Sequence, residues 1–378
     1  MRICIVYDCL YPHTVGGAER WYRNVAQRLA QDGHKVTYLT MRQWDGEEAL
    51  DVPGVRVVAV APRMQLYSGG QRRILPPLAF GLGVLWHLLR DGRRYDVVHT
   101  ASFPYFSLLA AAVVRPFARY RVFVDWHEFW TRDYWREYLG EFGGRIGWEV
   151  QRLCVRVRQR AFCFSHLVEG RLHGEGVHGP VTRLGGQFEG QAVSTPQQAE
   201  PLVVFAGRHV PEKNPVAVVH AVAKARETVP ELRAAIYGDG PEWPKVLAAI
   251  AGHGLDGTVE APGFVDEKVI DGALAHALCL VLPSRREGYG LVVLEALSRG
   301  TPVVLVRGED NAAAEFVEVG RNGFVVSSAS ADDLAAAVIQ VHSAGPALRA
   351  STLEWFREGA ERLALHTSLQ QVTAAYEA

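Results

Sequence analysis

The 378-residue sequence lacks the short motifs by which several common enzyme classes are recognised. It contains no GxxxxGK(S/T) phosphate-binding loop and no GxSxG nucleophile motif. The segment that starts at Gly238 begins like the dinucleotide-binding motif GxGxxG, but Trp243 occupies the place of the third glycine. A P-loop enzyme, a serine hydrolase of the GxSxG type and a dinucleotide-dependent enzyme are therefore not expected.

Signatures of disulfides and metal sites are also absent from the sequence. The five cysteines are odd in number and scattered, without a CxxC pair or a Cys/His cluster. We interpret them as reduced and mostly buried, which fits a reducing compartment. No group of His, Asp and Glu residues has the spacing of a metal site, so we expect neither a metal nor another cofactor.

Long apolar runs are missing as well. The longest, around residues 75–86 and 106–114, fall short of the roughly 18–20 residues that a membrane-spanning helix needs. The sequence enters a predicted strand at Arg2 without the apolar region of a signal peptide. We therefore expect a cytoplasmic protein, with peripheral contact at the inner membrane face left open. Its hydrophobic content of 48% and charged content of 21% are typical of a globular protein.

Strands alternate with helices along the whole chain, which predicts an α/β protein with two Rossmann-like parallel-sheet domains facing a central cleft. In the first half the expected strands are 2–7, 35–40, 55–60, 96–100 and 121–125, and the expected helices are 18–32, 78–89, 105–114 and 146–160. In the second half the expected strands are 202–206, 233–237, 279–283 and 303–306, and the expected helices are 215–228, 243–251, 291–299 and 332–343.

The character of the sequence changes between residues 186 and 200, where Gly, Gln, Ser and Pro replace the apolar periodicity. We interpret this stretch as a linker between a first domain, residues 1–185, and a second domain, residues 201–353. Basic residues outnumber acidic ones in the first half of the chain, and the reverse holds in the second half. The two domains are therefore expected to meet different partners.

The helix expected at residues 146–160 combines apolar side chains with arginines on or beside it, namely Arg145, Arg152, Arg156, Arg158 and Arg160. One interpretation is a basic amphipathic surface for anionic lipid. The other is the solvated charged face of a packed helix, which is common in globular proteins. No nucleic-acid partner is expected, and the oligomeric state is left open.

The stretch from Ser284 to Pro302 combines the end of a buried strand, a glycine-rich turn and a helix that starts at Leu291. Backbone N–H groups at the start of such a helix point toward an anion. Glu287 lies on the turn, and Glu295 lies inside the helix, from which its side chain reaches back toward the same place. The alternative for Glu295 is a surface pair with Arg299 at the i, i+4 spacing.

Cationic and polar residues follow other predicted strands. Arg208 and Lys213 come after the strand at 202–206, where they could clamp a diphosphate or simply lie in solvent. His127 follows the strand at 121–125, and His99 ends another strand. Each histidine is interpreted either as a polar contact or proton-transfer group for a ligand, or as a structural residue.

Taken together, these segments resemble the family 4 retaining glycosyltransferases of the GT-B fold, the glycogen-synthase- and mannosyltransferase-like group 1 glycosyltransferases. The similarity runs essentially from end to end, and the spacing of Glu287 and Glu295 fits the family's pair of glutamates seven residues apart. It is carried in the second half by AGRHVPEKNP (206–215), YGDGPE (237–242), GFVDEKVI (263–270), PSRREGYGLVVLEALSRGTPVV (283–304) and EFVEVGRNGFVV (315–326), and in the first half by Gly16-Gly17, DVVHT (96–100) and DWHEF (125–129).

The resemblance implies a role for each matching position. Glu295 would bind the ribose hydroxyls of a sugar nucleotide, Arg208 and Lys213 its diphosphate, and Glu287 the hydroxyls of the donor sugar. His127 would lie near the reacting sugar, and Phe264 and Val265 would line the base. The implied catalytic residues are Glu287, His127, Lys213 and Arg208, and the implied donor site consists of Gly16, Gly17, Arg208, Lys213, Gly238, Phe264, Val265, Glu287, Gly288, Tyr289, Gly290, Leu291, Val292 and Glu295.

The implied activity is transfer of a hexose from a nucleotide diphosphate sugar to an acceptor hydroxyl with retention of configuration. The family's habits favour a UDP-sugar, and the acceptor is expected to be a sugar, a glycolipid or a small molecule. Cationic side chains would replace a metal, and residues 354–378 would return as a helix that completes the first domain. The alternatives are a nucleotide-sugar 2-epimerase of the same fold and a catalytically silent partner subunit.

The sequence departs from the family pattern in two places. The family's Asn-Gly-Val-Asp run at the end of the first domain corresponds here to the segment from Arg183 to Gln187. The ligand contacts of the family's run are therefore not assigned to this segment. Arg285 and Arg286 form an unusual cationic pair before Glu287, which could contact a charged donor or lie in solvent.

Overall fold

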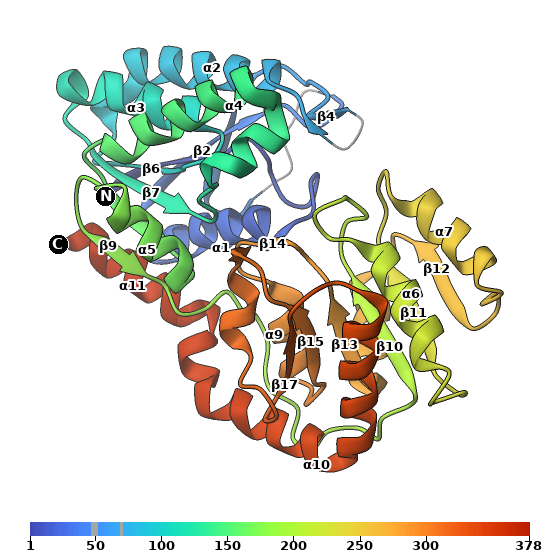
Figure 1. Cartoon of the computed structure of the whole chain (residues 1–378). Helices are drawn as coiled ribbons and strands as arrows, with labels where there is room; N and C mark the ends of the chain where they lie inside the picture. The colour runs from blue at the N-terminus through green and yellow to red at the C-terminus, as the bar shows by residue number, and fades with distance from the viewer. Residues whose placement is uncertain (47–51, 69–70) are drawn as a thin grey trace. The chain divides into compact units, whose positions relative to one another are not determined.

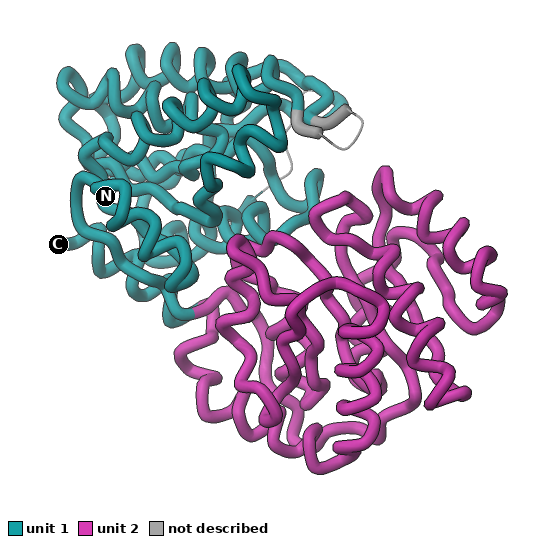
Figure 2. The backbone as a smooth tube through the Cα atoms, in the orientation of Figure 1, with its two compact units in different colours: residues 1–185, 366–378 teal, residues 186–365 magenta. Residues whose placement is uncertain are grey.

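The computed structural model describes residues 1–46, 52–68 and 71–378, and these residues form two compact units. Unit 1 comprises residues 1–185 and 366–378, and unit 2 comprises residues 186–365 (Figure 2). Each unit has its own parallel sheet with helices packed against it (Figure 1). In the described part of the chain, none of the helices combines the length and apolar character that crossing a membrane requires.

Unit 1 contains a seven-stranded parallel sheet in the order β3-β2-β1-β6-β7-β8-β9. Its strands are β1 (Arg2–Val6), β2 (Lys35–Met41), β3 (Val55–Ala61), β6 (Val97–Ala101), β7 (Arg121–Trp126), β8 (Arg160–Cys163) and β9 (Val181–Arg183). Its helical segments are α1 (Gly17–Gln31), α2 (Leu75–Asp91), the 3₁₀ turn η1 (Gly92–Arg94), α3 (Tyr105–Ala118), α4 (Arg132–Arg156), α5 (His166–Gly174) and α11 (Leu365–Glu377). A short antiparallel pair, β4 (Tyr67–Ser68) and β5 (Gln71–Arg72), precedes α2.

Unit 2 contains a six-stranded parallel sheet in the order β12-β11-β10-β13-β15-β17. Its strands are β10 (Leu202–Ala206), β11 (Arg233–Tyr237), β12 (Val259–Gly263), β13 (Cys279–Leu282), β15 (Val303–Val306) and β17 (Gly323–Val326). Two very short strands, β14 (Arg286–Glu287) and β16 (Asp310–Asn311), pair with each other outside this sheet. The helical segments are α6 (Pro215–Ala225), α7 (Trp243–Gly252), α8 (Glu267–His276), α9 (Leu291–Leu297), η2 (Ala312–Phe316) and α10 (Ala331–Leu363).

All the strands predicted from apolar runs are present. Among the sheet strands that had not been predicted, β8 is an internal strand of four residues, whereas β9, β12 and β17 each lie at an edge of their sheet. An edge strand pairs on one side only, so its sequence does not need the continuous apolar run of a central parallel strand. β12 even contains Pro262, a residue that sheets accept mainly at their edges.

Two helices are at least ten residues longer than predicted. The helix expected at residues 146–160 begins at Arg132, with non-helical backbone at Gly140, and ends at Arg156, so Arg160 lies in β8. The helix expected at residues 332–343 continues as α10 to Leu363, across non-helical backbone at Gly345. In both cases a glycine with positive φ interrupts the helical pattern without ending the segment.

The chain passes between the units twice, after Gly185 and after Leu365. Residues 186–200, the predicted linker, contain no helix and only one isolated bridge residue, Phe188, and they belong to unit 2. The N–H of Phe188 donates to Leu363 O at 3.1 Å, and its carbonyl oxygen accepts from the N–H of Leu365 at 2.9 Å. Residues 354–363 thus continue α10 in unit 2, and the returning helix of unit 1 is α11 alone.

A buried polar network attaches α11 to the sheet of unit 1. The hydroxyl of Tyr376 contacts Nδ1 of His99 in β6, and Nε2 of His99 lies 2.9 Å from a carboxylate oxygen of Asp125 in β7. The other oxygen of Asp125 accepts from the indole N–H of Trp21 at 2.7 Å. Burial alone raises the pKa of Asp125, but His99, His127 and the Trp21 N–H outweigh it and hold this pKa below its usual range.

We predict that substitution of Gly83 in α2 destabilises the protein. A Cβ at this position would lie 1.9 Å from the carbonyl oxygen of Val60 in β3, so Gly83→Ala forces α2 away from the sheet. Overpacking of this kind costs about 1–3 kcal/mol. The measurement is urea unfolding of the purified protein.

The matched control is Gly170→Ala in α5, where a Cβ meets no atom within 4 Å. Alanine is a better helix former, so the free energy of unfolding should rise by about 0.5–1 kcal/mol. Equal shifts for the two variants would contradict the packing of α2 described above.

We also predict an acid-dependent contribution from Asp125. Its pKa is lower in the folded protein than its ordinary value of 3.8, so the carboxylate stabilises the fold fully above that pH. The contribution is lost as pH falls through the lower, folded pKa. Urea unfolding of Asp125→Asn should therefore show lower stability at pH 7 and a smaller loss below about pH 4 than the unsubstituted protein. Parallel curves for the two proteins would show that the network does not hold this charge.

Candidate functional site

The sheet of unit 2 has a topological switch point between β10 and β13. From β10 the chain builds outward to β11 and β12 on one side, and from β13 to β15 and β17 on the other. Ligands of open parallel sheets bind outside the carboxyl ends of the strands at such a point. Residues 207–214 and 283–290 follow these two strands, so a ligand site is expected at these two loops.

An ion pair joins these two loops. The ammonium nitrogen of Lys213 lies 2.5 Å from Oε1 of Glu287, and both side chains are largely removed from solvent, with 20% and 10% exposed. The hydroxyl of Ser284 donates to the same oxygen at 2.9 Å. Two residues that the sequence motifs had singled out separately are therefore in direct contact.

The backbone around Glu287 is fixed from three sides. Strand β14, which carries Glu287, pairs with β16, so that Glu287 is opposite Asn311. The amide nitrogen of Asn311 donates to the carbonyl oxygen of Ser284 at 3.2 Å, and the N–H of Arg285 donates to Glu212 O at 2.8 Å. The roles of Ser284 and Asn311 had not been predicted, because a short polar residue near a strand end carries no motif of its own.

Gly290 determines how α9 begins. Its φ of +84° is left-handed, and a Cβ there would lie 2.6 Å from the Cβ of Ala313. Glycine is therefore required on both conformational and steric grounds. The helix that follows has only seven residues and starts with Leu291 and Val292, which are half-buried, as is Gly288 in the turn.

Glu295 lies one turn into α9 and is half-buried. The side chain of Arg299, the alternative partner suggested by the i, i+4 spacing, has a second acidic neighbour. Its guanidinium lies 2.6 Å from a carboxylate oxygen of Asp271 in α8 and donates to the backbone carbonyl of Glu295 at 2.5 Å.

The loop after β11 packs directly against the loop after β10. A Cβ at Gly238 would lie 1.9 Å from the carbonyl oxygen of Gly207, and Gly238 has a φ of +124°. The backbone N–H of His209 donates to Asp239 O at 2.9 Å. Arg208 between them is exposed, whereas the ring of His209 is buried, and burial lowers the pKa of this histidine. His209 is therefore neutral at pH 7, and Gly238 is a packing position in the wall of the site.

Two other predicted donor-site residues, Tyr289 and Phe264, differ in the exposure of their side chains. Tyr289 is buried, and its hydroxyl accepts from the backbone N–H of Gln187 at 3.0 Å, so its side chain stabilises the start of unit 2. Burial is the main cause that raises the pKa of this phenol. Phe264 follows β12 and is 73% exposed, while the neighbouring Val265 is half-buried.

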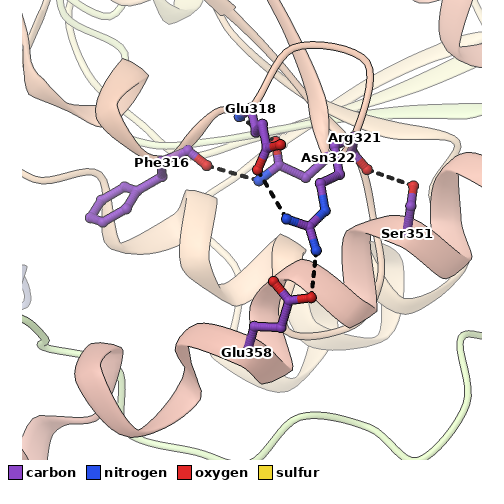
Figure 3. A network of polar contacts seen from close by, with 6 residues as sticks. All are labelled: Phe316, Glu318, Arg321, Asn322, Ser351 and Glu358. Carbon is purple, nitrogen blue, oxygen red and sulfur yellow. Dashed lines mark hydrogen bonds and ion pairs between the residues drawn. The ribbon is translucent and has the colours of Figure 1, made fainter.

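Residues of the motif EFVEVGRNGFVV take part in a network of polar contacts (Figure 3). The ring of Phe316 packs edge-on against Tyr289, with 5.0 Å between centroids. Asn322 donates to Phe316 O at 2.8 Å, and the guanidinium of Arg321 contacts Glu318 at 3.1 Å and Glu358 of α10 at 2.6 Å. This motif thus supports the site without being part of it.

The predicted site residues of unit 1 lie at the ends of β1 and β7. Gly16 is the N-cap of α1, which begins at Gly17. The carboxylate of Glu19 lies over this helix start, since its nearest oxygen would be 2.4 Å from a Cβ at Gly16. Here the glycine leaves room for a flexible side chain of its own helix, and any anion would have to share the position with Glu19.

His127 stacks flat on Phe164, with 4.9 Å between centroids and 4° between ring planes. Burial lowers the pKa of His127, although Asp125 and Glu128 act in the opposite direction. Its Nε2 is buried and forms no hydrogen bond within the described residues. The ring is therefore neutral at pH 7 and has a hydrogen-bonding atom without a protein partner, which requires an explanation.

Unit 2 therefore brings together Lys213 and Glu287, with Arg208 and Glu295 on the adjoining loop and helix, whereas His127, Gly16 and Gly17 belong to unit 1. Over residues 1–46, 52–68 and 71–378, no three His, Cys, Asp or Glu side chains are grouped as metal ligands.

Two family models match adjoining parts of the chain. The model described as Glycosyltransferase Family 4 matches residues 15–184, and the model described as Glycosyl transferases group 1 matches residues 187–352. Over 138 residues the chain is 31% identical to alpha-D-kanosaminyltransferase from Streptomyces kanamyceticus, which covers 36% of this chain and 35% of that protein. Over 379 residues it is 26% identical to glycogen synthase from Mycobacterium tuberculosis, which covers 90% and 86% of the two chains.

The chain spans only 18 to 50% of the length of five curated relatives that share 30 to 34% identity with it. Its structure is similar to that of HepE from Anabaena, solved in complex with UDP and glucose, with a TM-score of 0.73, 18% identity and full coverage of both chains. At this identity the similarity concerns the fold, which is GT-B. The resemblance inferred from the motifs is confirmed: the chain belongs to the family 4, group 1 glycosyltransferases.

Proposed function

We propose that the protein transfers a sugar from a nucleotide diphosphate sugar to an acceptor hydroxyl with retention of configuration. The observation that carries this proposal is the Lys213–Glu287 ion pair at the switch point of unit 2. In this proposal the cation binds the diphosphate, and the adjacent carboxylate binds sugar hydroxyls. HepE, which has the same fold and was solved with UDP and glucose, supports a UDP-sugar as the donor.

Lys213 is the residue proposed to stabilise the leaving diphosphate. A lysine ammonium has three N–H donors, and the contact with Glu287 uses one of them. The other two are available to phosphate oxygens, and the exposed Arg208 on the same loop can add a forked contact. Negative charge develops on the diphosphate as the bond to the sugar breaks, so fixed cations lower the barrier without a metal.

Glu287 is proposed to position the donor sugar. The contacts with Lys213 and Ser284 are both made through Oε1, which leaves Oε2 to accept from a sugar hydroxyl. A carboxylate held by a cation and a hydroxyl is a weaker nucleophile than an unpaired one. This favours attack by the acceptor on the face that the diphosphate leaves, with a phosphate oxygen taking the acceptor's proton.

Two further residues of unit 2, and separately one of unit 1, are proposed to contact the donor. Glu295 on α9 would accept from the ribose hydroxyls, and the exposed ring of Phe264 would lie against the base. His127 is neutral, and its unpaired Nε2 can exchange a hydrogen bond with a hydroxyl of the reacting sugar. A ligand at this position would account for a buried nitrogen that has no hydrogen bond among the described residues.

We predict that Lys213→Ala lowers kcat by about 10²–10³-fold, because it removes a positive charge that acts mainly on the transition state. Donor affinity should change much less than kcat. The readout is the rate of nucleotide diphosphate release with a saturating donor.

The matched control for this prediction is Lys224→Ala in α6. Lys224 also forms an ion pair, with Glu227 at 2.8 Å, but on the exposed surface. Its kcat should equal that of the unsubstituted protein. An unchanged kcat for Lys213→Ala would remove this residue from the diphosphate site.

The proposed function predicts that a nucleotide sugar raises the melting temperature and is slowly hydrolysed to the nucleotide diphosphate without an acceptor. A screen of UDP-, GDP- and ADP-sugars by thermal shift, followed by assays of diphosphate release, identifies the donor. With an acceptor present, NMR of the product should show the anomeric configuration of the donor.

Other outcomes of this screen would overturn the proposal. An inverted product would contradict retention. A changed free sugar, formed with no acceptor, would indicate a 2-epimerase, and binding without release of nucleotide diphosphate from any donor would indicate a silent subunit.

A further inference from the structure

Helix α2 of unit 1 exposes a continuous apolar stripe. Leu82 and Trp86 are its most exposed members, at 66% and 72%. The other exposed members recur at helical spacing on the same side, so that all of them share one face. The stripe consists of Leu75, Leu78, Leu82, Trp86 and Leu89.

The outward direction of this stripe is fixed by the opposite face of α2. Phe80, Val84 and Leu88 are buried in the core of unit 1. Gly81 and Gly83 allow very close packing, since a Cβ at Gly81 would lie 2.4 Å from the Cβ of Phe106 in α3. Because both flanks of α2 are tightly packed, the helix cannot rotate to bury Leu82 and Trp86.

The apolar surface continues onto α3, which lies alongside α2 (Figure 1). Val113 and Phe117, one turn apart on α3, are 60% and 68% exposed. Arg93, just after α2, donates to the carbonyl oxygen of Phe117 at 3.4 Å, which ties the C-terminal ends of the two helices together. We call the stripe of α2 together with Val113 and Phe117 the α2–α3 surface. An apolar surface that spans two packed helices is unusual for a solvated face and indicates an interaction site.

Arginines gather at one end of the α2–α3 surface. They are Arg90, Arg93, Arg94, Arg115 and Arg119. The only acidic residue in α2, η1 and α3 is Asp91, whose side chain is 17% exposed. It lies 3.6 Å from Arg90 and 3.0 Å from Arg94. The accessible charge of this region is therefore positive.

Helix α4, for which the sequence had suggested a basic lipid-binding surface, has a different charge pattern. In α4, Arg152 lies 3.5 Å from Glu149 and 3.3 Å from Glu175, and Arg160 is in β8, where it donates to Ala375 O at 2.9 Å. Acidic residues thus accompany the arginines of α4 and hold at least one of them. The segment that joins a large apolar face to arginines in excess over acidic residues is α2–α3.

We propose that the α2–α3 surface docks on the surface of an anionic lipid bilayer. Leucines and phenylalanine would enter the boundary between headgroups and acyl chains, and Trp86 has the side chain that membrane interfaces favour. The arginines at the end of both helices would bind lipid phosphates, whose charge they complement. A protein partner would need no such one-sided charge, and this proposal does not depend on the proposed sugar transfer.

The test is flotation of the full-length protein with two kinds of vesicle. One consists of phosphatidylcholine alone, and the other of phosphatidylcholine mixed with phosphatidylglycerol. The protein should float with the anionic vesicles, and added salt should weaken this binding, because mobile ions screen the arginine contacts. The double variant Leu82→Ser/Trp86→Ser should bind at least about tenfold more weakly, since its apolar anchors are lost.

Two control pairs separate the apolar and the electrostatic parts. Val319→Ser removes an apolar side chain that is 63% exposed in unit 2 and should bind like the unsubstituted protein. Arg90→Gln/Arg94→Gln should lose the preference for anionic vesicles, whereas Lys268→Gln, an exposed cation of α8, should keep it. All of these positions are exposed, and circular dichroism verifies that the variants are folded.

The proposal is wrong if the protein does not float, if the serine variants float as well as the unsubstituted protein, or if binding ignores both salt and lipid charge. Sedimentation without vesicles gives a further outcome. Self-association that Leu82→Ser/Trp86→Ser abolishes, with no vesicle binding, would show that a second copy of the chain covers this surface instead.

Discussion

The ammonium group of Lys213 lies 2.5 Å from the carboxylate of Glu287, and this contact connects the loops that follow two neighbouring parallel strands. Either charge alone would be costly in a place so poorly exposed to water, so each loop depends on the other. The surrounding structure holds this geometry. Ser284 donates to the carboxylate, Asn311 ties down the backbone of Ser284, and the N–H of Arg285 joins the two loops directly. The contact that is proposed to serve catalysis therefore also holds two loops of unit 2 together.

How much of the fold could be predicted depends on where a strand lies in its sheet. Central strands such as β13 are buried on both faces, and their apolar runs are visible in the sequence. The edge strand β12 reads VEAPG, with exposed positions and a proline, and nothing in that sequence distinguishes it from a loop. Its place follows from the pairing with β11, which is a property of the assembled sheet.

In the candidate site, too, local features could be predicted from the sequence and long-range contacts could not. Glycines, cations and carboxylates could be placed at strand ends from motif spacing, because backbone conformation and charge are local properties. Their partners could not. Tyr289 is part of the glycine-rich motif, but its hydroxyl binds Gln187, about a hundred residues earlier. The contact between His99 and Tyr376 joins residues 277 positions apart, so no local sequence pattern predicts it. The α2 stripe could not be recognised either, since an apolar run does not reveal which side remains exposed.

The division of unit 1 into two segments affects the order in which the protein can be completed. Synthesis proceeds from the N-terminus, so all of unit 2, residues 186–365, is made before the last segment of unit 1. Until Tyr376 has left the ribosome, the buried imidazole of His99 lacks its hydroxyl partner and the guanidinium of Arg121 lacks the carbonyl of Tyr376. Unit 1 begins the chain but is completed after unit 2. Its completion waits for the synthesis of the thirteen residues from His366 onward.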